Sequence, residues 1–250
     1  MITFPNAKIN LGLHVLNKRE DGYHQIETCL YPVELCDALE IIKSESFSFQ
    51  STGLEIAGDV DSNLVIKAYN LIKSDYAIPP VSIYLHKLIP MGAGLGGGSS
   101  DGAFALKMLD DLFDLKLDGD QLRKYASQLG SDCPFFIDNT LALASGTGTT
   151  LQPIDEHLDE YRIELRHLDV HMSTKEAYSL VRPTEGRKSI LDILQVPLYL
   201  WQLELVNDFE SPVLARFPAI QKAKNELIQE GALYAAMTGS GSSVFGIFKK

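Results

Sequence analysis

The residues most suited to chemistry lie in a glycine-rich segment in the first half of the chain. Glycine stands at positions 92, 94, 96, 97 and 98, and Ser99 and Ser100 follow directly. Such a density of glycine weakens a fold unless the backbone needs positive φ angles or close approach to a ligand. Backbone N–H groups that lead into a helix N-terminus bind anions, because the helix dipole adds positive charge there. The segment therefore predicts a phosphate-binding loop, in which the serine hydroxyls cap the helix and one also binds Mg²⁺.

Two common phosphate-binding motifs fit this segment poorly. Gly92, Gly94 and Gly97 match the G-x-G-x-x-G fingerprint of dinucleotide-binding proteins, which also needs an acidic residue near a strand end about twenty residues later. Here the corresponding region is predicted to be a helix and an Asp-rich turn around 110–114. No Gly-Lys-Ser/Thr follows the glycines, so a P-loop is disfavoured as well. A dinucleotide-dependent oxidoreductase is therefore an unfavourable alternative, as is a purely structural linker.

The surrounding patterns predict an α+β chain. The first strand alternates through Ile9, Leu11, Leu13 and Val15. Strands are predicted over 7–17, 24–33, 81–87, 161–166, 232–237 and 243–248, with a strand pair at 38–50 and 53–57 and short strands around 141–151. Helices are predicted after Ser62, after Ser100 and before Gly130, and near 174–181, 187–194 and 218–229. The polar stretch 153–160 predicts a boundary between domains 1–155 and 156–250.

The composition restricts the possible partners. The 22 basic and 33 acidic side chains give a formal net charge of −11, which disfavours nucleic acid as a partner. No run of roughly 18 apolar residues predicts a membrane span, and the first fifteen residues do not resemble a secretory signal. Three cysteines, Cys29, Cys36 and Cys133, lack zinc-site spacing and suit a reducing cytoplasm. We expect a cytoplasmic monomer or weak homodimer.

Four segments together resemble the GHMP kinase family. Residues 90–100 (PMGAGLGGGSS) resemble its phosphate loop, 4–11 (FPNAKINL) its first motif, 130–136 (GSDCPFF) its catalytic aspartate turn and 237–243 (MTGSGSS) its third motif. The resemblance extends over nearly the whole chain. It implies a two-domain fold with an N-terminal ribosomal protein S5 domain 2-like part, a C-terminal ferredoxin-like α/β sandwich and the active site in the cleft between them.

The same resemblance implies the roles of individual residues. Asp132 would be the base that accepts the proton of an acceptor alcohol, and Lys8 would hold Asp132 ionised. ATP would be the phosphoryl donor and Mg²⁺ its partner ion, bound by Ser99 or Ser100. The implied ATP-binding residues are Pro90, Met91, Gly92, Ala93, Gly94, Leu95, Gly96, Gly97, Gly98, Ser99 and Ser100, with Asn63 and Lys87 at the base and Gly239, Ser240 and Gly241 at the phosphates.

Two further segments are similar to the diphosphocytidyl-methylerythritol kinases within that family. Residues 21–24 (DGYH) resemble their cytidine-binding signature, and 173–178 (STKEAY) resemble a substrate-binding segment. The similarity implies that Tyr23 and Tyr178 sandwich a cytosine ring whose edge bonds to His24. Thr174 would contact the same substrate, and Asn10 would bind the acceptor hydroxyl. The implied substrate is a cytidine diphosphate-linked methylerythritol, phosphorylated at its C2 hydroxyl in non-mevalonate isoprenoid biosynthesis.

Two alternatives stay open within the same scaffold. A related kinase would act on mevalonate or homoserine, although residues 21–24 would then have no cytosine to bind. A catalytically silent nucleotide-binding regulator would have no need of Lys8 and Asp132, and both are present. The chain also departs from the commonest family pattern, with Thr238 where serine is usual and Asp101 directly after the two serines.

Overall fold

The contacts within the computed structural model divide the chain into two compact units. The structure describes residues 1–155, 158–170, 172–184 and 186–250. The first unit comprises residues 1–7, 34–91 and 96–140, and the second comprises 8–33, 92–95 and 141–250. The glycine loop therefore passes from the second unit to the first between Leu95 and Gly96.

These units differ from the predicted division at residue 155. Residues 8–33 and 141–155 lie in the second unit, because the strands that these two segments contribute form one sheet there. Residues 156 and 157, next to the predicted boundary, lie outside the described residues. A single boundary along the chain cannot describe units that are each assembled from separate segments.

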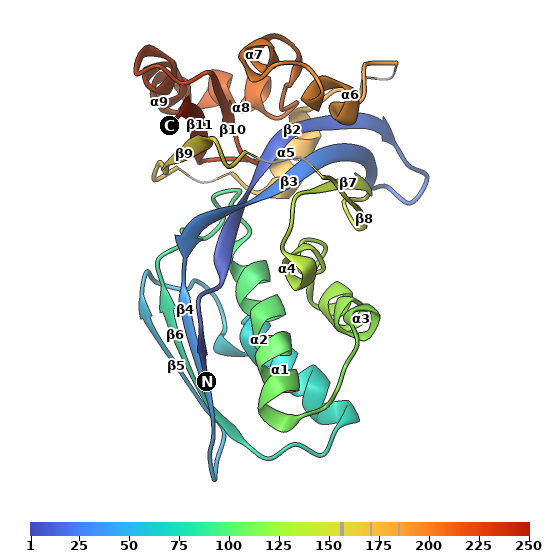
Figure 1. Ribbon diagram of the computed structural model, residues 1–250, viewed down its shortest axis with the longest axis vertical. Helices are drawn as coiled ribbons and strands as arrows, with labels where there is room; N and C mark the ends of the chain where they lie inside the picture. The colour runs from blue at the N-terminus through green and yellow to red at the C-terminus, as the bar shows by residue number, and fades with distance from the viewer. Residues whose placement is uncertain (156–157, 171, 185) are drawn as a thin grey trace. The chain divides into compact units, whose positions relative to one another are not determined.

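The first unit is a four-stranded sheet covered by helices (Figure 1). Its strands, in spatial order, are β1 (Ile2–Thr3), β4 (Ala38–Lys43), β6 (Val81–Lys87) and β5 (Ser48–Gly53). A 3-10 turn η1 (Val60–Ser62) and four helices follow in this unit: α1 (Leu64–Asp75), α2 (Gly97–Phe113), α3 (Gly119–Leu129) and α4 (Phe135–Asp138). The strand pair predicted over 38–50 and 53–57 is wrong in its bounds and in its pairing, because the strands observed are β4 and β5 and residues 54–57 lie outside any strand. Each strand pairs with β6 instead, β4 antiparallel and β5 parallel.

The second unit contains two sheets. One has the order β2 (Asn6–Lys18), β3 (His24–Cys36), β7 (Ala142–Gly146) and β8 (Thr150–Pro153), and the other β10 (Tyr234–Met237), β11 (Val244–Lys249) and β9 (Tyr161–Arg166). Its helical segments are α5 (Thr174–Leu180), α6 (Ile190–Leu194), η2 (Leu198–Leu200), α7 (Trp201–Glu204), α8 (Glu210–Arg216) and α9 (Pro218–Gln229). The sequence patterns predicted α5, α6 and α9 but missed the short α7 and α8.

The simple alternation predicted for the first strand changes at Gly12. This residue has a φ of +68°, which L side chains rarely adopt. Before it, the Asn10 side chain bonds to that of Thr28 on β3. After it, Leu13 and Val15 share a buried cluster with Ile26, which lies two residues from Thr28 on the same strand. Even-numbered residues before Gly12 and odd-numbered residues after it therefore face the same side, as expected for a β-bulge.

Candidate active site

The first turn of α2 leaves its backbone N–H groups available to a ligand. The helix begins at Gly97, and its N-cap, Gly96, has no side chain that could accept a hydrogen bond from the first turn. The prediction that the serine hydroxyls cap this helix is therefore wrong, because Ser99 and Ser100 already lie inside its first turn. A long helix whose first N–H groups lack a side-chain acceptor offers them to an anion.

The glycines of the loop are required for different reasons. Gly92, Gly94 and Gly96 have φ angles of +65°, +75° and +71°, so each adopts a left-handed conformation. At Gly97 a Cβ atom would lie 2.7 Å from the Ile89 side chain, whereas at Gly98 the nearest atom would be 3.9 Å away. The chain itself therefore does not require glycine at position 98. Open space beside the helix N-terminus is what the close approach of a phosphate demands.

Lys87 lies in a buried ion cluster of the first unit. Its ammonium group donates to Asp37 and, at 2.6 Å, to Asp101, and all three side chains are almost fully buried. Asp37 also accepts hydrogen bonds from the backbone N–H groups of Leu88 and Ile89. The cluster connects the end of β6 to the first turns of α2. The ammonium group of Lys87 thus joins parts of the first unit through ion pairs. The expected role of Lys87 beside the nucleotide base of ATP did not include this structural role.

The effect of burying this cluster is seen in the pKa of Asp101. Burial raises its pKa to about 8, and the carboxylate of Asp37 adds to the shift while Lys87 opposes it. Its second oxygen, Oδ1, is buried without a hydrogen-bond partner among the described residues. Because burial and the Asp37 carboxylate together outweigh the Lys87 ammonium, Asp101 favours its protonated form.

The other predicted nucleotide and metal residues of this unit are also defined. The Asn63 side chain caps α1 by accepting from Val65 N at 2.9 Å, which is its alternative structural role. The Ser100 hydroxyl is buried and has no partner among the described residues. Ser99 is partly exposed and lies close enough to the Cys133 thiol to lower its pKa slightly against the effect of burial. Of the two serines, Ser99 is the more exposed.

Asp132 lies in the turn between α3 and α4, as its motif predicts. It is partly buried and directly precedes Cys133, whose pKa burial raises to about 11. Cys133 is therefore a neutral thiol, in agreement with a structural role. Ser99 contacts this turn, so the start of α2 and the aspartate turn meet inside the first unit. Lys8 belongs to the second unit, and its pairing with Asp132 stays a prediction.

Lys8 and Asn10 form the centre of a polar cluster in the second unit. Both side chains are 4% exposed, and the Lys8 ammonium donates to Asn10 Oδ1 at 2.7 Å and to the Gly94 carbonyl at 3.1 Å. Asn10 Nδ2 donates to Thr28 Oγ1 at 2.9 Å. The pair predicted from strand periodicity is thus brought together, and Asn10 orients the lysine.

Thr238 of the third motif joins this cluster to the glycine loop. Its hydroxyl oxygen accepts a hydrogen bond from Asn10 N at 3.0 Å. The hydroxyl proton can be donated to the Gly94 carbonyl, at 2.9 Å, or to Asn10 Oδ1, at 3.2 Å. A Cβ atom on Gly94 would overlap the Thr238 carbonyl. The backbones of the two loops therefore touch, and threonine supplies the hydroxyl that serine would supply in the commoner pattern.

The remaining third-motif residues extend toward the predicted substrate segment. Gly239 and Gly241 have φ angles of +54° and +84°, and Ser240 Oγ lies 3.4 Å from Thr174 Oγ1 at the start of α5. The sequence placed Thr174 with the acceptor substrate and Ser240 with the phosphates. The residue expected to bind the acceptor substrate and the residue expected to bind the phosphates are therefore neighbours in the second unit.

The aromatic residues of the expected cytidine site are assembled in an unexpected order. The rings of His24 and Tyr178 are stacked, with centroids 4.8 Å apart and an interplanar angle of 12°. Phe209 packs edge-on against Tyr178, whereas Tyr23 is 67% exposed. A cytosine between Tyr23 and Tyr178 would need the other face of Tyr178 or a movement of His24. Burial lowers the pKa of His24, and Lys18 adds to the shift, which favours the neutral imidazole.

The turn before these aromatic residues has its own explanation. The Asp21 carboxylate accepts from Tyr23 N at 3.0 Å and pairs with Arg19. Gly22 has a φ of +84°, and a Cβ atom there would have no described neighbour within 4 Å, so conformation alone favours glycine at this position. Asp21 and Gly22 therefore shape the turn, and Tyr23 and His24 are the residues available for binding.

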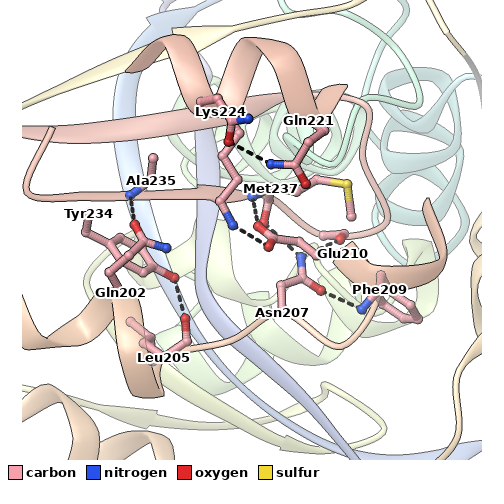
Figure 2. Close-up of polar contacts among 12 residues, drawn as sticks. Gln202, Leu205, Asn207, Phe209, Glu210, Gln221, Lys224, Tyr234, Ala235 and Met237 are labelled. Carbon is pink, nitrogen blue, oxygen red and sulfur yellow. Dashed lines mark hydrogen bonds and ion pairs between the residues drawn. The ribbon is translucent and has the colours of Figure 1, made fainter. Parts of the chain in front are cut away.

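Sequence reasoning missed the segment 207–210, which supports the third motif (Figure 2). Asn207 donates to the carbonyls of Met237 and Gly239, both at 2.8 Å. Glu210 accepts from Met237 N at 2.5 Å and pairs with Lys224. The only signal in the sequence was a short polar run, Asn207-Asp208, before a helix, and such a run is usually a cap.

Comparisons with known sequences identify the family. The sequence model of the GHMP kinases N-terminal domain matches residues 63–140, and that of the GHMP kinases C-terminal domain matches 198–250. A protein of Parabacteroides distasonis named 4-diphosphocytidyl-2-C-methyl-D-erythritol kinase is 52% identical over 250 residues, which cover 100% of this chain and 92% of that protein. A protein of the same name from Cytophaga hutchinsonii is 53% identical over 249 residues, or 99% and 92% of the two chains.

Solved structures agree with this relationship. A crystal structure of 4-(cytidine 5'-diphospho)-2C-methyl-D-erythritol kinase has a TM-score of 0.85 and 32% identity, covering 99% of this chain and 90% of that one. A mevalonate kinase has a TM-score of 0.69 at 13% identity, covering 100% and 91%, and therefore shares the fold. No helix among the described residues is long and apolar enough to cross a membrane. From its motifs, its fold and these relatives, the chain belongs to the GHMP kinase family.

Proposed function

We propose that this protein phosphorylates the C2 hydroxyl of 4-diphosphocytidyl-2-C-methylerythritol with ATP. The observation that carries the proposal is the Lys8–Asn10–Thr238 cluster, which touches Gly94 of the phosphate loop. It places a buried ammonium group beside the loop whose other end begins α2. The whole-length identity of 52% to a relative with that enzyme name supports the choice of substrate.

The chain's own residues suit a transfer that depends on positioning and charge. Asp132 takes the proton of the acceptor hydroxyl as the oxygen of that hydroxyl attacks the γ-phosphorus of ATP. The bond between the γ-phosphorus and the ADP oxygen breaks, and ADP leaves. Lys8 provides a fixed positive charge, and the N–H groups of Gly97 and Gly98 donate hydrogen bonds to phosphate oxygens. Mg²⁺ bound with ATP would neutralise phosphate charge, and the partly exposed Ser99 fits its ligand shell better than the buried Ser100.

The aromatic group of the second unit supports a flat, neutral base as part of the substrate. His24, Tyr178 and Phe209 pack against one another, and stacking on an aromatic ring typically contributes about 1–3 kcal/mol per base. Mevalonate and homoserine have no such ring. The solved kinases named for those substrates are 13–17% identical to this chain, so their likeness extends to the fold alone.

A coupled ADP-release assay tests the proposal. The purified chain receives Mg-ATP with 4-diphosphocytidyl-2-C-methylerythritol, mevalonate, homoserine or galactose. We expect turnover with the cytidylated alcohol only. Turnover with another alcohol would keep the kinase activity but contradict the proposed substrate. ATP binding without turnover of any of the four alcohols would favour a catalytically silent nucleotide-binding regulator. The proposal includes a cytoplasmic monomer or weak homodimer without nucleic-acid or membrane partners, which gel filtration and cell fractionation test.

A further inference from the structure

Asn207 occupies a buried position between β2 and the third motif. It is 3% exposed, and its backbone forms an isolated parallel bridge with Leu13 of β2. Leu13 N donates to Val206 O, and Asp208 N donates to Leu13 O. The main chain thus fixes Asn207 beside Leu13. Leu13 lies three positions beyond Asn10 on β2, the strand that also carries Lys8.

The side chain of Asn207 directs both of its donor bonds to the third motif (Figure 2). Its Nδ2 group donates to the carbonyls of Met237 and Gly239, and its Oδ1 accepts from Phe209 N. Both carbonyls flank Thr238. One neutral amide group therefore holds the 237–238 and 239–240 peptide units, which lie before and after the Thr238–Gly239 peptide.

Thr238 passes this constraint to the proposed catalytic centre. Its hydroxyl bonds to Asn10 N, and Asn10 Oδ1 in turn receives the Lys8 ammonium. Rotation of the Thr238 backbone would move this hydroxyl, because a buried threonine side chain has few alternative rotamers. Small displacements of catalytic groups are costly, since an error of about 1 Å can reduce a rate by about 100-fold.

We propose that Asn207 is a positioning residue that holds Thr238, and through it Asn10 and Lys8, in the geometry for phosphoryl transfer. The inference rests on the proposed function and adds a residue that the family motifs do not include. The donor bonds of the Asn207 side chain end on the carbonyls of Met237 and Gly239, so its effect on Lys8 and Asn10 passes through the third motif.

The chain offers a matched control at the other end of β10. Gln202 Oε1 accepts from Ala235 N at 2.9 Å, so its amide also supports this strand, at a residue that precedes the third motif (Figure 2). Gln202→Ala should lower stability with an unchanged kcat. Asn207→Ala should lower kcat about 100-fold with a much smaller change in the KM for either substrate.

A charge variant separates positioning from general destabilisation. Asn207→Asp keeps the acceptor for Phe209 N but turns a carboxylate toward two carbonyls, which repel it unless it is protonated. Its kcat relative to the wild type should therefore rise as the pH falls from 8 to 6, as measured in the assay. Hydrogen exchange at Thr238–Ser243 should also accelerate in Asn207→Ala and not in Gln202→Ala, independently of turnover.

The outcomes distinguish the inference from the function on which it rests. If the wild-type protein did not turn over the cytidylated alcohol, the proposed function would be wrong. The exchange measurement would then still test whether Asn207 holds the third motif. An active wild type with a folded Asn207→Ala variant of unchanged kcat would overturn the positioning role. Equal losses of kcat in Asn207→Ala and Gln202→Ala would overturn it as well, because both changes would then act through stability. If Asn207→Ala fails to fold, the pH profile of Asn207→Asp decides.

Discussion

The two loops of the proposed phosphate site are anchored by opposite kinds of chemistry. In the first unit, the start of α2 is joined to the end of β6 by charged groups, the ammonium of Lys87 and the carboxyl groups of Asp37 and Asp101. In the second unit, the charged Glu210 contacts the third motif at Met237 N, whereas the groups that hold it around Thr238 are neutral, the amide of Asn207 and the hydroxyl of Thr238 itself.

The difference indicates what each anchor costs. Burying charges carries a desolvation penalty that the partners must offset, and the raised pKa of Asp101 is its visible sign. An amide group offers donor and acceptor without charge, so its geometry is insensitive to pH. The ionic anchor should therefore dominate stability and its pH dependence, whereas the neutral anchor should dominate catalytic geometry.

The largest expected effect comes from breaking the ionic anchor. Asp37→Ala would leave Lys87 with one buried partner and the N–H groups of Leu88 and Ile89 without their acceptor. We expect a loss of about 3–5 kcal/mol in the free energy of unfolding, measured with urea. The matched control is Asp120→Ala, whose pair with Arg123 is exposed and should contribute little. Similar losses in both variants would contradict the importance of the buried cluster.

The next effect concerns the neutral anchor. Thr238→Val removes the hydroxyl that joins Asn10 to Gly94, whereas Thr238→Ser keeps it. We expect Thr238→Val to reduce kcat by about 10–100-fold, equivalent to about 1.4–2.7 kcal/mol in the activation barrier. The serine variant should stay within a few-fold of the wild type in the same ADP-release assay. Equal activity of both variants would show that the hydroxyl is unimportant.

The ionic anchor should also make stability depend on pH. Since the pKa of Asp101 rises from 3.8 to about 8 on folding, the folded protein keeps a proton that the unfolded chain releases between these values. The free energy of unfolding should therefore fall as the pH rises through this window, by up to about 1.4 kcal/mol per pH unit, and change little from this cause above it.

Asp101→Asn should remove this contribution, so the difference between the urea-unfolding curves of the two proteins should change with pH. Asp120→Asn provides the control, because that side chain is exposed. A constant difference between wild type and Asp101→Asn from pH 5 to 8 would show that Asp101 does not hold the proton.

The smallest expected effect separates ligand binding from folding within the glycine loop. Gly98 lies in α2 without a close neighbour, so Gly98→Ala should leave stability unchanged or raise it by up to about 1 kcal/mol. The new methyl group would nevertheless occupy space offered to a phosphate, and we expect the KM for ATP to rise about 10-fold. Gly94→Ala is the contrasting variant, because it overlaps the Thr238 carbonyl and should lower the melting temperature. An unchanged KM for Gly98→Ala would argue against phosphate binding there.

The sequence by itself determined the local elements and the order of the motifs. The glycine density predicted a loop before a helix, and three of its glycines indeed adopt positive φ. Strand periodicity put Lys8 and Asn10 on one face, and their side chains meet. These properties depend on backbone conformation and near neighbours, so they are encoded within a few residues. The family resemblance, confirmed by the relatives, identified the scaffold on which they lie.

Only the tertiary structure decided which distant groups serve as partners. Lys87, expected at a nucleotide base, pairs with Asp37 and Asp101, and His24 stacks on Tyr178. Asn207 reaches Met237 and Gly239 across about 30 positions of sequence, and Gly12 reverses the alternation of its strand. Such contacts arise when segments far apart in the chain pack together, and no local pattern specifies which buried polar group will meet which. The sequence therefore supplies the reactive groups, and packing decides which of them act and which hold the others in place.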